Sequence, residues 1–387
     1  MTVVVVGGGI VGMASAYYLR RRGVDVTVLE RSSVGAGSTE RAVGGIRAQF
    51  SSPVNVRLSL AAMAVWDEFE ETFGVDIEHR RVGYALLARD SDTADRLRRT
   101  VEMQRELGVE VETLAPAALR DRADVAVHAD RFELATYGPR DGVADPHLAL
   151  QGFATAAREA DTEIRTNTPV RDVRSADGRV AAVETDDGSI DCEYVVNAAG
   201  PWAGRVGQMV GLDLPVSPQR RQVAVVAPER PVPETAPLTF DADRGVYFLP
   251  DREGDALVGG HFGAADERDP DDYPTDYDLD WALTALERAA DCAAHFGPDT
   301  GLRRGWSGLY AVTPDRSPIV EESRPGFVNA VGFSGHGVMH APATGQVVAE
   351  IVTEGAPRTV DVSALRLDRF RRDGTDERGH RPEANVL

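Results

Sequence analysis

The chain has 387 residues, of which 62 are Asp or Glu and 42 are Lys or Arg, and its formal net charge is −20. All 42 basic residues are Arg, so Schiff-base chemistry, a P-loop lysine and a lysine-activated nucleophile are excluded. The excess of acid disfavours nucleic-acid binding, because such a surface repels phosphate backbones.

A carboxylate-rich surface keeps a protein soluble where salt screens ordinary repulsion. We interpret the acid excess as adaptation to high salt; the alternative is an ordinary acidic protein with biased codon usage. The two cysteines, Cys192 and Cys292, form no CxxC motif, so no zinc-ribbon, iron–sulfur or other metal site is predicted. The weakly polar run 3–14 is too short to span a bilayer and no signal pattern precedes it, so we expect a cytoplasmic protein.

The first thirty residues predict a dinucleotide-binding unit. The β-branched run 2–6 indicates a strand buried on both faces, and the motif GGGIVG at 7–12 follows at once. A helical stretch comes next, then a second buried strand over 24–29 that ends at Glu30. The glycines allow a tight turn, a close approach to a pyrophosphate and close packing of helix on strand. The order of strand, glycines, helix, strand and acid favours this reading over an ordinary glycine-rich turn.

Glu30 distinguishes among the dinucleotides. Its carboxylate can accept hydrogen bonds from both ribose hydroxyls of an adenosine and would repel the 2′-phosphate of NADP, although Arg31 beside it leaves that cofactor open. The small residues of 35–41 permit close backbone contact with a second phosphate group or a ring system.

Four segments resemble the FAD-dependent amine and amino-acid oxidoreductases of the D-amino-acid oxidase superfamily. They are GGGIVG at 7–12, GAGSTERAVGGIRAQF at 35–50, VVNAAGPWAG at 195–204 and GFSGHGVMHAPATGQVVAEIV at 332–352. The resemblance is to the branch that contains sarcosine oxidase, dimethylglycine dehydrogenase and FAD-dependent proline dehydrogenase subunits. It implies that FAD is bound by Gly7, Gly9, Ile10, Val11, Gly12, Glu30, Arg31, Ser38, Thr39, Val170, Ala198, Gly200, Trp202, Gly308, Gly335, His336, Gly337 and Val338.

The remaining elements predict an α/β protein, α+β overall, with a Rossmann-like FAD-binding domain and an interleaved antiparallel-sheet substrate domain. Helices are expected over 56–73, 92–107, 146–160 and 341–354, and strands over 82–88, 170–173, 180–185, 194–198, 222–226, 246–249, 256–259 and 327–331. Segment 266–280 is expected to be an acidic loop. The FAD-binding domain would comprise 1–80, 140–214 and 302–362, the substrate domain 81–139 and 215–301, and the C-terminal tail 363–387.

The resemblance also places the substrate site. It implies that Arg47 clamps a substrate carboxylate, for which the bidentate fork of a guanidinium is suited, and that His261 lies beside the flavin. Tyr310 and Tyr247 resemble substrate-contacting tyrosines of the family. Each of these residues could instead be structural: a surface arginine, a satisfied histidine, or core aromatics.

Three positions depart from the family pattern. A lysine that activates oxygen is replaced by Leu257, so electron transfer to an acceptor other than oxygen is expected. A cysteine that attaches flavin covalently is replaced by Gly308, so the FAD is expected to be non-covalent. A lysine that helps to hold the carboxylate is replaced by Met339, which puts sarcosine itself in question as the substrate.

The leading hypothesis is therefore an FAD-dependent dehydrogenase that oxidises the C–N bond of a secondary or cyclic amino acid. Its electrons would leave through a partner subunit, a quinone or a soluble carrier. The alternatives are a 2-hydroxy-acid dehydrogenase with His261 or His336 as base, an amino-acid oxidase that uses oxygen, and a non-catalytic FAD-binding subunit.

Overall fold

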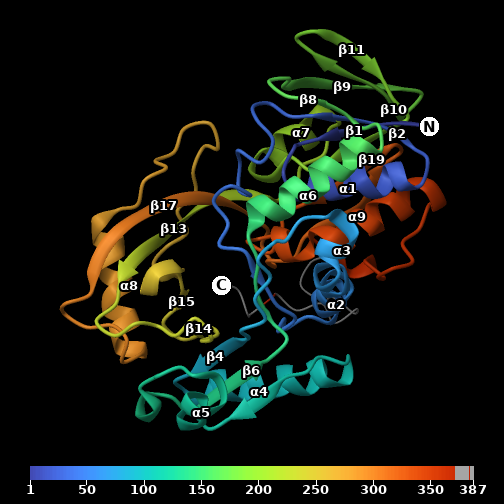
Figure 1. The fold of residues 1–387 in the computed structure, drawn as a ribbon. Helices are drawn as coiled ribbons and strands as arrows, with labels where there is room; N and C mark the ends of the chain where they lie inside the picture. Colours follow the sequence, from blue (N-terminus) through green and yellow to red (C-terminus); the bar gives the residue numbers. More distant parts are fainter. Residues whose placement is uncertain (371–382, 384–387) are drawn as a thin grey trace.

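The computed structural model describes residues 1–370 and residue 383, and within them it contains four sheets (Figure 1). The six-stranded sheet has the order β18 (Ile319–Arg324), β19 (Phe327–Val331), β12 (Tyr194–Asn197), β1 (Thr2–Val6), β2 (Asp25–Leu29) and β8 (Glu163–Arg165). All of its strands are parallel except β18, which is antiparallel to β19. This is the doubly wound arrangement expected of a Rossmann-like unit.

Strand β1 is the centre of this sheet and is buried on both faces, as its unbroken valine run predicts. Val3 and Val5 pack with α1 (Ile10–Arg21), α2 (Pro53–Asp67), α6 (Pro146–Glu159) and α9 (Gly337–Glu354). Val4 and Val6 pack on the other face with α7 (Ala203–Met209) and a three-stranded sheet of β9 (Val170–Ala176), β10 (Arg179–Thr185) and β11 (Gly188–Asp191). The two-residue period of a strand thus divides one run of apolar residues between two cores.

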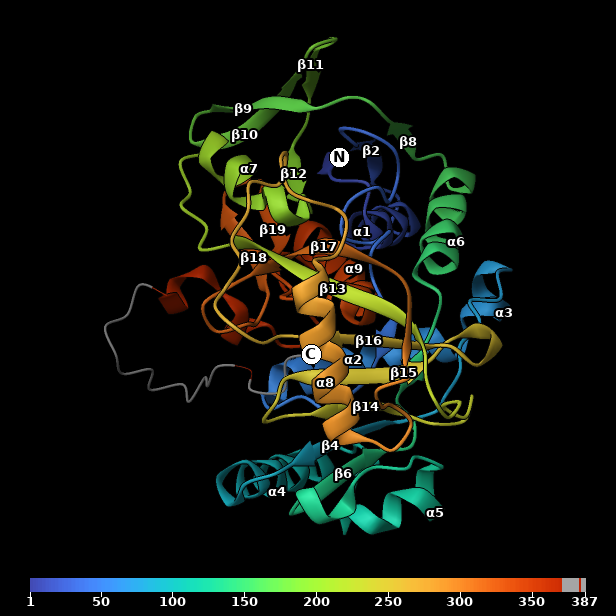
Figure 2. The same cartoon turned by 90° about the vertical axis from the view of Figure 1, so that its left-hand side faces the viewer.

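The eight-stranded sheet forms the other large unit. Its order is β17 (Gly301–Val312), β13 (Ser217–Ala227), β16 (Ala256–Gly260), β15 (Val246–Pro250), β14 (Leu238–Asp241), β4 (Tyr84–Ala88), β6 (Leu134–Gly138) and β5 (Glu112–Leu114). Helix α8 (Leu279–Cys292) covers β15 and β16, as Figure 2 shows, and α4 (Ser91–Glu106) and α5 (Leu119–Ala123) lie at the far end. A two-stranded ladder of β3 (Gly45–Ile46) and β7 (Gly142–Val143) pairs two distant segments of the chain.

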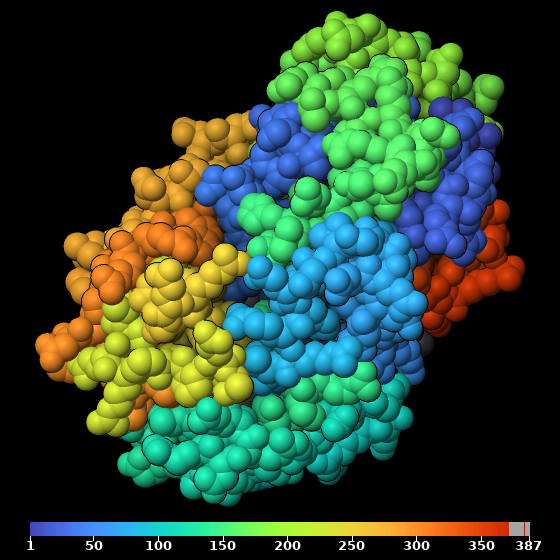
Figure 3. All heavy atoms as spheres, viewed as in Figure 1, coloured from blue at the N-terminus to red at the C-terminus, as the bar shows by residue number. Residues whose placement is uncertain are grey.

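The predicted fold class is confirmed, with a Rossmann-like parallel sheet and a second, mostly antiparallel sheet. The segments that build each sheet are interleaved along the chain. In Figure 3 the blue, green and red parts of the chain lie together on one side of the molecule, and the yellow and orange parts lie on the other. The expected domain boundary at 302 falls at the start of β17, which pairs along its length with β13 and so belongs to the eight-stranded sheet.

Several elements differ from the sequence-based expectation. The helix expected over 56–73 ends at Asp67, and Phe69 begins a separate helix, α3 (Phe69–Phe73), with its ring stacked 5.3 Å from that of Trp66. Helix α9 begins at Gly337 rather than 341, because the carbonyl of His336 already accepts the hydrogen bond of the first turn, from the amide of His340. Helix α8 was not expected.

No helix among the described residues is long and apolar enough to cross a membrane. Of the predicted tail 363–387, the structure describes residues 363–370, which carry two short 3₁₀ turns, and Glu383; the remainder of the tail lies outside the described residues.

Candidate functional site

A cavity of about 720 Å³, here called the cofactor cavity, lies between the carboxyl end of the six-stranded sheet and the eight-stranded sheet. Its wall draws on the turn after β1, the end of β2, segment 35–45, the segment after β12, β17 and the loop before α9. Ligands of open α/β sheets bind at this edge. All the residues predicted to bind FAD line this cavity except Gly12, which lies behind the wall.

The glycines shape the end of the cavity nearest β1. Gly7 has φ +112°, and a Cβ there would meet the carbonyl oxygen of Ala198 at 2.4 Å. A Cβ on Gly12 would meet the carbonyl oxygen of Gly7 at 2.0 Å, so α1 packs against the turn with no room for a side chain. The N-terminus of α1, with its partial positive charge, therefore points into a cradle that suits a pyrophosphate.

Glu30 lies where β2 ends and lines the same wall. Its carboxylate accepts hydrogen bonds from the backbone N–H of Gly8 at 2.7 Å and of Ser32 at 2.8 Å. These bonds fix the carboxylate beside the glycine turn, where it can accept hydrogen bonds from ribose hydroxyls. The glycine cradle and the carboxylate of Glu30 together fit the adenosine diphosphate part of FAD.

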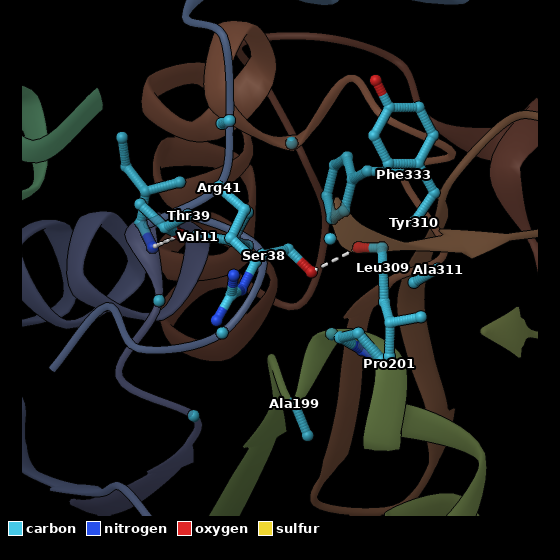
Figure 4. A pocket seen from close by; sticks show the side chains of 18 of the residues that line it. Val11, Ser38, Thr39, Arg41, Ala199, Pro201, Leu309, Tyr310, Ala311 and Phe333 are labelled. Atoms are coloured by element: carbon cyan, nitrogen blue, oxygen red, sulfur yellow. Dashed lines mark hydrogen bonds between the residues drawn. The ribbon is translucent and has the colours of Figure 1, made fainter. Parts of the chain in front are cut away.

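Segment 35–45 is tied across the cavity to the eight-stranded sheet. The hydroxyl of Ser38 donates to the carbonyl of Leu309 on β17 at 2.6 Å, as Figure 4 shows, and the hydroxyl of Thr39 accepts from the N–H of Ile10 at 3.2 Å. On β17, a Cβ at Gly308 would meet the side chain of Arg41 at 2.8 Å. Segment 35–45 and β17 thus meet at the wall of the cavity.

The acidic loop that precedes α8 closes over the outer end of the cavity. Asp271 lines the wall and forms ion pairs with Arg31 at 2.5 Å and with Arg205, while the indole N–H of Trp202 donates to it at 2.8 Å. The hydrogen bond from Trp202, followed by that from Arg205, holds the pKa of the Asp271 carboxyl far below its ordinary value. The carboxylate therefore stays charged and ties three separate segments together.

At the inner end of the cavity, aromatic side chains line much of the wall. Tyr84, Tyr247, Tyr310 and His261 line the wall there, all from strands of the eight-stranded sheet or their ends. Burial raises the pKa of each tyrosine above its ordinary value. Burial, and then the charges of two arginines, lowers the pKa of His261 well below 6.5, so its imidazole is neutral at physiological pH.

His336 faces these rings from the loop before α9 and is also buried and neutral, because burial lowers its pKa well below 6.5. Its Nε2 lies 3.4 Å from Nη2 of Arg47. Arg47 itself is fully buried but does not line the cavity: its guanidinium lies over the ring of Phe50 at 4.2 Å and donates to the carbonyl of Gln49 at 2.5 Å. The structure thus brings His261, Tyr310 and Tyr247 to the cavity and places Arg47 behind His336.

Tyr84 and Arg221 line the cavity beside His261 and Tyr310, and the sequence did not predict either of them as a site residue. Tyr84 is completely buried, and its hydroxyl has no hydrogen-bond partner in the described part of the chain. Arg221 lies on β13 beside His261. A tyrosine at the start of an apolar strand and one arginine among many carry no distinctive sequence signal. Cys192 and Cys292 are buried and neither lines the cavity.

Comparison with known proteins gives matches along nearly the whole chain. A protein-family model described as FAD dependent oxidoreductase matches residues 2–351. The FAD-dependent oxidoreductase domain-containing protein 1 of Bos taurus is 33% identical over 95% of this chain and 84% of its own length. The sarcosine oxidase subunit beta of Rhizobium meliloti is 29% identical over 99% of this chain and 92% of its own length. The crystal structure of L-proline dehydrogenase from P. horikoshii has a TM-score of 0.87 and 29% identity, covering 97% of this chain and 99% of that chain.

Proposed function

The chain belongs to the DAO family of FAD-dependent oxidoreductases, and from this premise we propose that it oxidises the C–N bond of a secondary or cyclic amino acid, of the sarcosine, dimethylglycine or proline class. The relatives support this substrate class through their names, which include a sarcosine oxidase subunit and an L-proline dehydrogenase.

One observation carries the proposal: at the end of the cofactor cavity opposite Glu30, the described residues that line the wall are aromatic side chains with Arg221 beside them and no carboxylate. Loss of hydride from carbon requires the amine to be neutral, because an ammonium nitrogen has no lone pair to form the C=N bond. The surroundings that keep His261 unprotonated also disfavour an ammonium. The site would therefore select the neutral amine, and Tyr310 and Tyr247 beside it would orient its ring or methyl group.

When bound, FAD supplies the two-electron acceptor for the hydride that leaves the carbon next to nitrogen. The chain's own residues hold the amine: the imidazole of His261 and the hydroxyls of Tyr310 and Tyr247 offer hydrogen bonds at the cavity wall. The imine that forms is hydrolysed by water, which releases an aldehyde in the N-methyl case. Because no cysteine lines the cavity in the described part of the chain, we propose that the FAD is held without a covalent bond.

We further propose that the electrons pass to a partner subunit or a quinone rather than rapidly to oxygen. The name of the Rhizobium relative, a subunit, supports a multi-subunit assembly. Leu257 supports it from this chain: it packs on the cluster that contains Tyr84 and Tyr247, and its side chain carries no charge that could assist the reaction with oxygen.

The clamp proposed from the sequence, Arg47, has a direct test. Its guanidinium would have to turn from Gln49 and Phe50 to reach a ligand in the cavity. Arg47→Ala is expected to raise KM strongly with FAD still bound if Arg47 is the clamp, and an unchanged KM would remove it from the site.

The test of the proposed function is an anaerobic titration of the purified protein at high salt. L-Proline, sarcosine, dimethylglycine, other D- and L-amino acids and 2-hydroxy acids are added in turn while the visible absorption of the flavin is followed. Bleaching by one of the secondary or cyclic amino acids supports the proposal. Bleaching by a 2-hydroxy acid alone would replace it with the hydroxy-acid alternative, in which the neutral His261 acts as base.

A further inference from the structure

A second cavity of about 470 Å³, here called the polar chamber, adjoins the cofactor cavity. The two share Arg221, Gln222, His261, Tyr310 and Ser334. The aromatic end of the cofactor cavity therefore borders the polar chamber, and a ligand at His261 and Tyr310 can extend into the chamber.

The chamber carries more positive than negative charge. Three arginines line it, Arg220, Arg221 and Arg316, against one acid, Asp266. The charge of Arg220 is balanced by Asp278, with which it forms an ion pair at 2.5 Å. Within the described residues, no carboxylate lies within 4.0 Å of the guanidinium of Arg221 or of Arg316.

Arg221 is the more enclosed of these two cations. It is half-buried, and its hydrogen-bond acceptors within residues 1–370 are uncharged oxygens, the carbonyl of Arg220 at 3.0 Å and Oε1 of Gln219 at 2.7 Å. Its Nε is buried and has no hydrogen-bond partner in the part of the chain that the structure describes. Burial lowers the pKa of Arg221, which reflects the free energy lost when a charge leaves water without an anion beside it.

The position of Arg221 fits a substrate anchor. Its guanidinium carbon lies 5.7 Å from the centre of the Tyr310 ring, and that ring lies 5.4 Å from the ring of His261. An amino acid whose carboxylate meets Arg221 therefore has its nitrogen and the adjoining carbon within reach of His261 and Tyr310. Arg316 is exposed and lies at the rim, where its charge attracts anions that the acidic surface elsewhere repels.

We infer that Arg221 binds the carboxylate of the substrate and that the polar chamber, with Arg316 at its rim, is the route by which the anionic substrate reaches the cofactor cavity. This inference rests on the proposed function and deepens it. The substrate class becomes amino acids with a free carboxylate, and amines or amino-acid amides without one are poor substrates.

The experiment uses a proline analogue that cannot be oxidised at nitrogen. Cyclopentanecarboxylate and its uncharged partner cyclopentanecarboxamide are titrated into the FAD-loaded protein at fixed salt, and binding is followed by the change in flavin absorption and by calorimetry. The carboxylate is expected to bind at least tenfold more tightly than the amide. Arg221→Gln should raise the Kd of the carboxylate at least tenfold, close to that of the amide, and Arg221→Lys should recover part of the loss.

Arg303→Gln is the matched control, because it removes one exposed arginine from the neighbouring strand β17 outside both cavities, and it should leave Kd unchanged. Undiminished binding in Arg221→Gln, absence of carboxylate binding to the wild-type protein, or a loss seen only in Arg47→Gln would each overturn the inference. A failure of the proposed function gives a different result: no amine bleaches the flavin, although carboxylate binding still depends on Arg221.

Discussion

The rings of His261 and Tyr310 lie edge to face, with centroids 5.4 Å apart and planes at 87°. Both side chains line the cofactor cavity and the polar chamber, so the pair stands at the junction of the two. The backbone N–H of His261 donates to the carbonyl of Gly245, and Tyr310 packs on Gly335, where a Cβ would meet its ring at 2.3 Å. The eight-stranded sheet therefore fixes the position of His261, and the loop before α9 packs on the ring of Tyr310.

Replacing His261 by Asn is expected to lower kcat/KM for the best amine by about 100-fold, because the imidazole that orients the amine is lost, with FAD still bound. In the wild-type protein, kcat/KM should show no inflection near pH 6.5, because burial holds the pKa of His261 well below that value. Steady-state kinetics from pH 5.5 to 9 provide both measurements. His147→Asn, an exposed histidine on α6, is the control; a full imidazole inflection would contradict the neutral assignment.

Gly12→Ala is expected to abolish FAD binding and to destabilise the protein. A Cβ at this position would meet the carbonyl oxygen of Gly7 at 2.0 Å, and neither backbone can shift without opening the pyrophosphate cradle. Gly204→Ala on α7 is the matched control, since the nearest atom to a Cβ there is 3.9 Å away. That substitution should stabilise its helix by up to about 1 kcal/mol. Equal FAD affinity in the two variants, measured by reconstitution, would contradict the role of the turn.

Asp271→Asn is expected to weaken FAD binding about fivefold, the equivalent of about 1 kcal/mol for a partly exposed ion-pair network. The carboxylate joins Arg31, Arg205 and Trp202 over the outer end of the cavity. Asp95→Asn breaks an exposed pair with Arg98 on α4 and supplies the control. The Kd of FAD for the apoprotein is the measurement. If both variants bind FAD like the wild type, the loop does not retain the cofactor.

Leu257→Lys is expected to speed the reoxidation of the reduced protein by air, because it places a cation on the cluster that contains Tyr84 and Tyr247. A positive charge near a reduced flavin stabilises the anionic species formed when oxygen takes an electron. Leu257→Met keeps the volume without the charge and should behave as the wild type. Stopped-flow mixing with oxygen measures the rate, and fast reoxidation of the wild-type protein would identify an oxidase instead.

The cofactor end could be predicted from the sequence because its constraints are local. A valine run, a glycine turn and an acid at the next strand end occur within thirty residues, and each has one dominant physical reading. Helix α8 was not predicted because its buried residues are small and give a weak apolar signal beside an acidic loop. They are Ala282, Ala285, Ala289 and Cys292.

The substrate end could not be predicted in the same way because it is assembled by long-range pairing. Arg221 is next to Arg220 in sequence, yet one guanidinium meets Asp278 and the other meets no carboxylate within the described residues. Which of the two faces solvent, a partner or a cavity depends on the register of β13 with β17 and β16. The adaptation to high salt inferred from the charge stays a prediction.

His340 gives a pH-dependent prediction about stability. It is fully buried beside Ser59, and burial lowers its pKa to about 3 from 6.5. Below pH 6.5 the unfolded chain takes up a proton at this imidazole and the native state does not, so the free energy of unfolding falls as the pH drops from 6.5 towards 3. One such group contributes at most about 1.4 kcal/mol per pH unit.

His340→Gln should therefore reduce the loss of stability between pH 6.5 and pH 5 by about 2 kcal/mol, even if the variant is less stable at pH 7. Asp141 works in the opposite direction, because burial raises the pKa of its carboxyl to about 6 and its native state holds a proton that the unfolded chain has lost. The difference between variant and wild type cancels this contribution. Denaturant unfolding at fixed salt is the measurement, with His147→Gln as the control for loss of an exposed imidazole. Parallel stability curves for His340→Gln and the wild type would show that His340 titrates alike in both states.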